Sequence, residues 1–135
     1  MKVADASILC DFVLGVPEVV EAVHGGPAEL SDPLYCPSFA DVEALNALRG
    51  LERSRKLTSA RAERAVRDLG RVRMVNCSVG SLSGRMWELR HNLTAYDAAY
   101  LALAERMRDG VLLTRDRGLA KAARAALGDA RVQLV

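Results

Sequence analysis

Short apolar runs alternate along the chain with longer segments in which apolar residues recur at helical spacing. The runs at residues 2–4, 34–36, 71–76, 111–114 and 131–135 predict β-strands. The segments between them predict helices at residues 7–14, 17–23, 39–55, 58–69, 78–90, 94–105 and 118–127. Strands that alternate with helices form parallel sheets through right-handed crossovers, so we expect an α/β fold.

Two of these segments predict deep burial. Residues 98–104 are all apolar, so the helix at 94–105 should be buried on nearly every side. The run at 111–114 is almost continuously apolar, which is typical of a strand covered on both faces of a parallel sheet.

Other positions set the orientation and the limits of the predicted helices. In the helix at 39–55, one stripe at helical spacing should face the core, and it consists of Val42, Leu45 and Leu48. Gly80 and Gly84 weaken the helix at 78–90. Turns are expected at Gly25-Gly26-Pro27 and at Ser31-Asp32-Pro33.

Length and composition indicate a single domain, residues 1–135, with an aliphatic core. Half of the residues are hydrophobic and only 4% are aromatic, which suits Leu, Val and Ala packed between helices and a small sheet. The 19 basic and 17 acidic residues nearly balance, so this chain is not a polybasic nucleic-acid arm. Any contact with RNA must come from the local placement of charge.

The cysteines and the N-terminus predict a cytoplasmic protein. Cys10, Cys36 and Cys77 form no CxxC pair, and as an odd number they cannot all be paired, so we expect reduced core residues. Asp5 and Asp11 interrupt the apolar start before a secretory signal could form. The sequence lacks an apolar run as long as a membrane span, and we expect no membrane association.

Four carboxylates are the candidate chemistry, although each also has a plain structural explanation. Asp5 and Asp116 follow predicted strands, where an Asp often caps the next helix. Asp97 and Thr94 resemble a capping box. Glu43, in the first turns of its helix, is on its own better explained as a solvated surface residue.

The alternative is that all four carboxylates converge above the C-terminal edge of the sheet, where ligands bind in open α/β folds. Carboxylates in one pocket repel each other unless protons or a cation neutralise them. Oxygen ligands without a His or Cys partner suit Mg²⁺ or Mn²⁺. Such ions typically meet phosphates, so this arrangement implies phosphodiester hydrolysis.

Competing chemistries lack their signatures. The chain has neither a GxGxxG nor a GxxxxGK[ST] pattern after a strand, and no GxSxG elbow. His24 and His91 lack the spacing of zinc ligands. A receiver domain would carry an acceptor Asp after the third strand, but that strand ends in Val75-Asn76-Cys77.

Four segments together resemble the PIN-domain ribonucleases, and specifically the VapC-type toxins of type II toxin–antitoxin systems. They are Val3-Ala4-Asp5-Ala6-Ser7, the stretch from Pro37 through Glu43 to Asn46-Ala47-Leu48, the stretch from Tyr96-Asp97-Ala98 through Tyr100 to Ala104, and Thr114-Arg115-Asp116. They occur in the family's order over nearly the whole chain. Residues 15–32 match no pattern of the family that we can specify.

This resemblance implies a site and a fold. Asp5, Glu43, Asp97 and Asp116 would hold one or two Mg²⁺ or Mn²⁺ ions, and the hydroxyls of Ser7 and Thr114 would order the carboxylates and the metal's waters. The fold would be a single PIN domain, with a five-stranded parallel sheet, the first strand central and helices on both faces.

The resemblance also implies partners. Similar bacterial proteins are homodimers that cut RNA, often a tRNA or a ribosomal RNA, and so inhibit translation and growth. A VapB-like antitoxin holds them inactive by covering the acidic groove. The alternative is a non-catalytic PIN-like module that binds a protein or RNA partner, but the complete acidic set argues against it.

The rim of the expected site offers possible RNA contacts. Arg115, Arg117 and Arg90 could hold phosphates, and each is about equally well explained as a solvated surface charge. Unpaired bases are usually stacked on aromatic or Arg side chains. The candidates for stacking are Tyr96, Trp87 and Tyr35, each of which could equally be a core residue.

Overall fold

A computed structural model of the chain describes residues 1–25 and 32–135. They form a five-stranded sheet in the order β3-β2-β1-β4-β5, in which every neighbouring pair is parallel. The strands are β1 (Lys2–Ala4), β2 (Leu34–Pro37), β3 (Met74–Cys77), β4 (Val111–Thr114) and β5 (Val132–Leu134). The predicted parallel sheet with the first strand at its centre is therefore confirmed.

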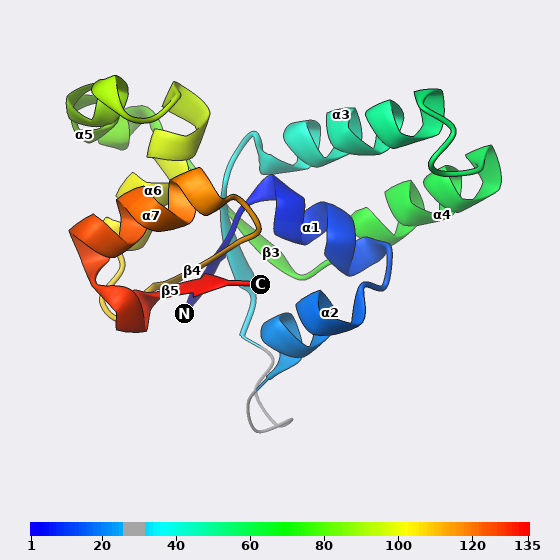
Figure 1. The fold of residues 1–135 in the computed structure, drawn as a ribbon, viewed down its shortest axis with the longest axis horizontal. Helices are drawn as coiled ribbons and strands as arrows, with labels where there is room; N and C mark the ends of the chain where they lie inside the picture. Colours follow the sequence, from blue (N-terminus) through cyan, green and yellow to red (C-terminus); the bar gives the residue numbers. More distant parts are fainter. Residues whose placement is uncertain (26–31) are drawn as a thin grey trace.

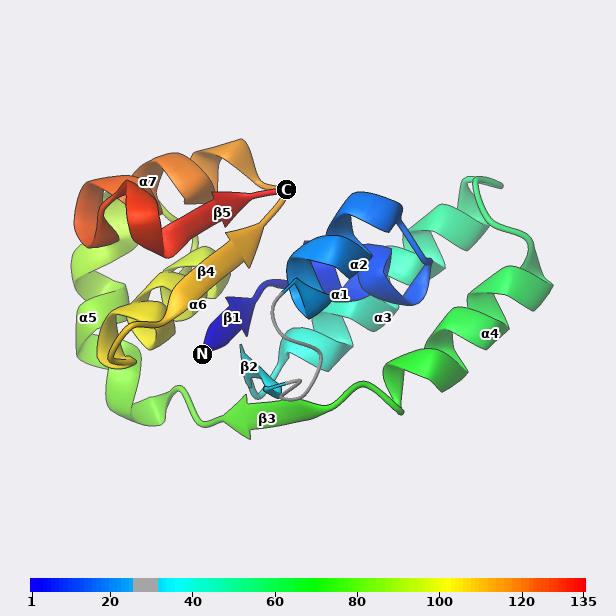
Figure 2. The same cartoon turned by 90° about the horizontal axis from the view of Figure 1, so that it is seen from below.

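The helices lie in two groups, α1 to α4 on one side of the central strands and α5 to α7 on the other (Figures 1 and 2). Their bounds are α1 (Ala6–Val13), α2 (Pro17–His24), α3 (Ala40–Arg53), α4 (Ser59–Leu69), α5 (Ser83–Glu88), α6 (Ala95–Arg106) and α7 (Arg117–Leu127). The fold is the predicted α/β fold. Within the described ranges, no helix has both the length and the apolar character needed to cross a membrane.

The core is centred on β1, β4 and α6. Val3, Leu112 and Leu113 have no exposed surface, as expected for strands covered on both faces. All seven residues of the apolar run Ala98–Ala104 are buried, which confirms the burial predicted for this helix. Since the core of one chain already buries this run, it does not offer a free surface for a second copy.

The stripe predicted to bury α3 is wrong for two of its three members. Val42 is 62% exposed and Leu45 is also exposed, whereas Leu48 is buried. The buried row of α3 consists of Ala40, Ala44 and Leu48, at i, i+4 and i+8. This face packs against α1, and alanines permit the close approach of the two helices.

Three predicted boundaries also differ. The helix predicted at 78–90 is split into 3₁₀ turns at Gly80–Leu82 and Leu89–His91 around the short α5, because glycines disfavour a continuous helix here. The third strand starts at Met74 because the N–H groups of residues 71 and 72 still bond to the end of α4. The fifth strand starts at Val132, after the 3₁₀ turn Asp129–Arg131.

Lys2 joins β1 to the end of α2. Its Nζ donates hydrogen bonds to the carbonyls of Ala22, Val23 and Gly25, at 2.7, 2.9 and 3.2 Å. A cation at this position satisfies the unpaired carbonyls of a helix C-terminus. The turns predicted at Gly25-Gly26-Pro27 and Ser31-Asp32-Pro33 lie partly outside the described residues.

The three cysteines are free, as predicted. Cys10 and Cys36 are buried and Cys77 is half-buried. Burial raises the pKa of Cys10 to about 11 and that of Cys36 to about 12, so both thiols are protonated at neutral pH.

Candidate active site

Asp5 lies at the junction of β1 and α1, where its carboxylate caps the helix and is 5% exposed. Oδ1 accepts hydrogen bonds from the Ile8 N–H at 3.0 Å and from the Ser7 hydroxyl at 2.5 Å. Oδ2 accepts a hydrogen bond from the Thr114 hydroxyl. Burial raises the pKa of Asp5, and these hydrogen bonds oppose that rise.

Ser7 and Thr114 connect Asp5 to the end of β4. Thr114 is fully buried, and its Oγ1 accepts a hydrogen bond from the Asp116 N–H at 2.9 Å. The Ser7 Oγ accepts one from the Arg115 N–H at 3.2 Å. Since β1 and β4 are parallel neighbours, their C-terminal ends meet at one edge of the sheet, and the two hydroxyls fix the geometry there.

Asp116 occupies at α7 the position that Asp5 occupies at α1. Its Oδ1 accepts a hydrogen bond from the Leu119 N–H at 2.7 Å, which caps the helix. Capping is therefore a real role of both strand-end acids. Asp116 is nevertheless exposed, and it lies at the same sheet edge as Asp5. Its charge raises the pKa of Asp97.

Glu43 lies in the first turn of α3, and a buried tyrosine donates a hydrogen bond to its carboxylate. Its Oε2 accepts a hydrogen bond from the Tyr100 hydroxyl at 2.7 Å, and Tyr100 is 2% exposed. Burial raises the pKa of Glu43, the Tyr100 bond lowers it, and the charges of Asp97 and Asp5 raise it again. Glu43 is thus half-buried, unlike an ordinary surface glutamate.

The link from Tyr100 to Glu43 is absent from the sequence-based prediction of the site. The spacing of Tyr100, three residues after Asp97, puts these two side chains on one face of α6 and could have marked Tyr100 as a neighbour of the acids, but it does not identify Glu43 as the partner of its hydroxyl.

Asp97 lies in the first turn of α6. The Thr94 hydroxyl caps this helix by accepting a hydrogen bond from the Asp97 N–H at 3.2 Å, so the predicted capping by Thr94 is present. Burial raises the pKa of Asp97, a hydrogen bond from Thr94 lowers it, and the charges of Asp116 and Asp5 raise it. Asp97 therefore lies within electrostatic reach of the other three predicted acids, Asp5, Glu43 and Asp116.

The donor set fits a hydrated divalent cation. Burial raises the pKa values of Glu43 and Asp97, the charges of neighbouring carboxylates raise them further, and a cation would relieve this repulsion. In the described ranges, no three or more His, Cys, Asp or Glu side chains are arranged to hold a metal ion by themselves. Ions that keep several waters need only one or two direct carboxylate ligands, so the remaining acids would act through those waters.

A family model for the PIN domain matches residues 2–125. The chain belongs to the PIN-domain family. Its similarity to curated proteins narrows this to the VapC type. VapC ribonuclease Mb0985 of Mycobacterium bovis and Ribonuclease VapC9 of Mycobacterium tuberculosis are each 36% identical over 95 residues, which is 70% of this chain and 74% of theirs. Ribonuclease VapC3 of Mycobacterium tuberculosis is 33% identical over 120 residues, which is 89% of this chain and 85% of that protein.

The three arginines expected at the rim of this PIN domain differ in their contacts. Arg115 is paired with Asp11 at 3.2 Å and with Glu18 at 3.4 Å, so it joins α1 and α2. Arg90 lies 4.6 Å above the centre of the Trp87 ring and donates to the Trp87 carbonyl. Arg117 is exposed and has no ion pair within the described residues, which makes it the freest of the three for a phosphate.

The three aromatic residues considered for base stacking also differ in their exposure to solvent. Trp87 is 68% exposed and Tyr96 is 57% exposed, whereas Tyr35 is half-buried in β2 and packs against the core. Trp87 and Tyr96 are thus the more exposed of the three, and Tyr96 directly precedes Asp97.

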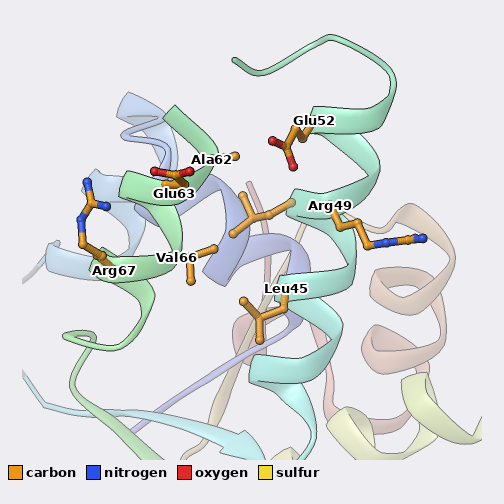
Figure 3. Close-up of a pocket in the computed structure, with 8 residues that line it drawn as sticks. Leu45, Arg49, Glu52, Ala62, Glu63, Val66 and Arg67 are labelled. Atoms are coloured by element: carbon orange, nitrogen blue, oxygen red, sulfur yellow. The ribbon is translucent and has the colours of Figure 1, made fainter. Parts of the chain in front are cut away.

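A groove between α3 and α4 of this VapC-type protein is lined by none of the four acids (Figure 3). Leu45 and Val66 form its apolar part, with Arg49, Glu52, Glu63 and Arg67 around them. The exposed Leu45 of the mistaken core stripe therefore lines a surface groove.

Proposed function

We propose that this PIN domain is a Mg²⁺- or Mn²⁺-dependent endoribonuclease and the toxin of a toxin–antitoxin pair. The observation that carries the proposal is that the pKa values of Glu43 and Asp97, which are raised first by burial, are also raised by neighbouring carboxylates: that of Glu43 by Asp97 and Asp5, and that of Asp97 by Asp116 and Asp5. The VapC relatives are named as ribonucleases, which supports the same activity for this chain.

In the proposed reaction, Asp5, Glu43, Asp97 and Asp116 would hold a divalent metal ion and its waters. The chemistry that such an ion would supply when bound is a water of lowered pKa as the nucleophile and stabilisation of the leaving oxygen of the phosphodiester. Ser7 and Thr114 keep the Asp5 carboxylate in one orientation, and Tyr100 does the same for Glu43. Arg117, next to Asp116, binds a phosphate that flanks the cleaved bond.

Cleavage assays with matched variants test this proposal. We expect the wild type to cut RNA with Mg²⁺ or Mn²⁺ but not with EDTA. Glu43→Gln and Asp97→Asn should each lose at least about 100-fold in rate, because each removes one charge that binds the metal. Glu52→Gln, farther along α3, and Asp41→Asn, two residues before Glu43, should keep wild-type activity. Wild-type rates in Glu43→Gln and Asp97→Asn would refute the assignment of the site.

The substrate and the partner are also proposals. We propose that the RNA is a tRNA or ribosomal RNA in the bacterial cytoplasm, and that a VapB-like antitoxin covers the acidic groove. New RNA 5′ ends after induction of the toxin would identify the target. Growth should stop on induction and resume when the small reading frame upstream of the gene is co-expressed.

A homodimer remains part of the proposal, on the strength of the VapC resemblance alone. The apolar run of α6 is buried within its own chain, so the contact between copies must use other surfaces. Small-angle scattering at working concentration should give twice the mass of one chain, and a monomeric mass would remove the dimer from the proposal.

A further inference from the structure

Tyr96 is a large aromatic residue left exposed beside the acidic site. It is 57% exposed and lies in the first turn of α6, directly before Asp97. An aromatic ring that is mostly in water contributes little burial to the fold. The exposed ring is therefore available to a ligand that reaches the carboxylates.

Aromatic contacts hold the Tyr96 ring in a fixed place relative to those carboxylates. Its centroid lies 5.2 Å from that of Phe39, with the two rings at 87°. Phe39 is the N-cap residue of α3 and packs edge-on against Tyr100, at 5.8 Å and 81°. Tyr100 in turn donates its hydroxyl to Glu43. The ring is thus fixed to both helices, α3 and α6, that carry half of the acidic set.

We propose that Tyr96 is a stacking platform for an unpaired nucleobase that flanks the scissile phosphate of a single-stranded RNA. This inference rests on the ribonuclease activity proposed above and names the form of RNA that the site accepts. Every base has a π-face, so a preorganised ring stacks bases irrespective of sequence. A base within a duplex is already stacked on its neighbours and is not free to leave them without a cost.

The surrounding charge favours RNA over a protein as the occupant. RNA bound through Tyr96 would also carry phosphates, which a metal held by the acids and the exposed Arg117, next to Asp116, would bind. The hydroxyl of Tyr96 has no hydrogen-bond partner within the described residues, so it is free to bond a base edge. An apolar protein segment would use neither the metal nor Arg117.

Three proteins test the inference in one assay: the wild type, Tyr96→Phe and Tyr96→Leu. The probe is a short unstructured RNA that contains 2-aminopurine, cleaved with Mn²⁺. Tyr96→Leu should raise KM about 10-fold with a smaller effect on kcat, and should lose the quenching of 2-aminopurine on binding. Tyr96→Phe keeps the ring and should retain KM within about 3-fold, together with the quenching. The same RNA annealed to its complement should be a poor substrate for all three.

Two controls separate stacking from damage to the site. Titration with Mn²⁺ in the absence of RNA should give the same affinity for all three proteins, because Tyr96 is not a metal ligand. Val66→Ala removes an exposed apolar side chain from the groove between α3 and α4, which none of the four acids lines, and should leave KM unchanged.

The outcomes distinguish this inference from the proposed function. If the wild type cleaves RNA and Tyr96→Leu has the same KM and quenching, the stacking role is wrong and the nuclease proposal stands. If Tyr96→Leu keeps its KM but changes the mass in scattering, the ring belongs to a protein interface and the inference is again wrong. If the wild type neither binds nor cleaves RNA, both proposals fail.

Discussion

The four acids of the site differ in what their carboxylates bond to. Asp5 and Asp116 accept hydrogen bonds from backbone N–H groups at the start of α1 and α7, so each stabilises a helix. Within the described residues, the Glu43 side chain accepts a hydrogen bond only from the Tyr100 hydroxyl. The charges of two other carboxylates, Asp116 and Asp5, raise the pKa of Asp97. Asp5 and Asp116 therefore support the fold, while Glu43 and Asp97 are charged groups whose partial burial has a cost in stability.

Tyr100→Phe tests the role of the buried hydroxyl at the residue scale. The hydroxyl stabilises the charged form of Glu43, so its removal should raise the pKa of Glu43 further. We expect the acidic limb of the pH–rate profile to move to higher pH and Mn²⁺ to bind several-fold more weakly at pH 6. The folded structure should survive, since the ring stays and only one hydrogen bond is lost, at about 1 kcal/mol.

Tyr35→Phe is the matched control for Tyr100→Phe, because it also removes one tyrosine hydroxyl but lies in β2, away from Glu43. It should leave the pH profile where it is. An unshifted profile in Tyr100→Phe would mean that the hydroxyl does not tune Glu43.

At the scale of elements, the interior glycine of α3 leads to a prediction on stability. A Cβ at Gly50 would meet no atom within 4 Å, and the residue is exposed in a helix. Gly50→Ala should therefore raise the free energy of unfolding by about 0.5–1 kcal/mol, or about 2–4 °C in Tm, through the entropy of the unfolded chain. Thermal unfolding followed by circular dichroism measures this change.

Gly15→Ala is the contrasting variant. Gly15 also has open space around it, but its φ is +74°, a conformation that an L-residue adopts only with strain. The same added methyl should here lower Tm. If both variants shift Tm in the same direction, the contrast between helix entropy and backbone strain does not hold for this chain.

The elements also show where sequence patterns suffice. The helix at 94–105 and the strand at 111–114 were predicted because an unbroken apolar run predicts burial on all sides and its length separates a helix from a strand. The orientation of α3 was missed, since its core face is built from Ala40 and Ala44 and the larger Val42 marked the wrong row. Alanine is only weakly hydrophobic, so the sequence pattern does not mark it as a core residue. Ala40 and Ala44 are core residues here because α1 packs closely against this face of α3.

Like the helices and strands, the site was predicted from the sequence only in part. Four acids were predicted from strand ends and first helical turns, and the structure brings Asp97 within electrostatic reach of the other three. The Tyr100–Glu43 bond joins residues 57 positions apart, so local spacing does not reveal it. Nor does local spacing show that Arg115 is bound to Asp11 and Glu18, because that depends on how α1 and α2 pack.

For the whole molecule, the acidic site predicts how stability depends on pH and metal. In the metal-free protein the pKa values of Asp5, Glu43 and Asp97 are raised above their ordinary values of 3.8, 4.5 and 3.8. The folded state therefore holds protons that the unfolded chain has released, and stability should fall as pH rises from about 4 through the raised pKa values.

Differential scanning fluorimetry checks this prediction. Tm without metal should be lower at pH 7 than at pH 5, and 5 mM Mn²⁺ should raise Tm at pH 7 more than at pH 5. Asp97→Asn should raise the metal-free Tm at pH 7 by about 2 °C, because it removes a repelled charge worth about 0.5 kcal/mol. Asp41→Asn is the control and should show no rise. A metal-free Tm that increases from pH 5 to pH 7 would contradict the raised pKa values.

The helix-capping role of Asp5 has a consequence for how related genes would decay. If a descendant of this gene lost its nuclease activity, selection on folding would still retain Asp5, since its carboxylate joins β1, α1 and β4. Glu43 and Asp97 would be free to drift, and their loss would relieve repulsion. Among PIN-domain relatives, an intact Asp5 is thus a weak sign of an active enzyme, and paired acids at positions 43 and 97 are a stronger one.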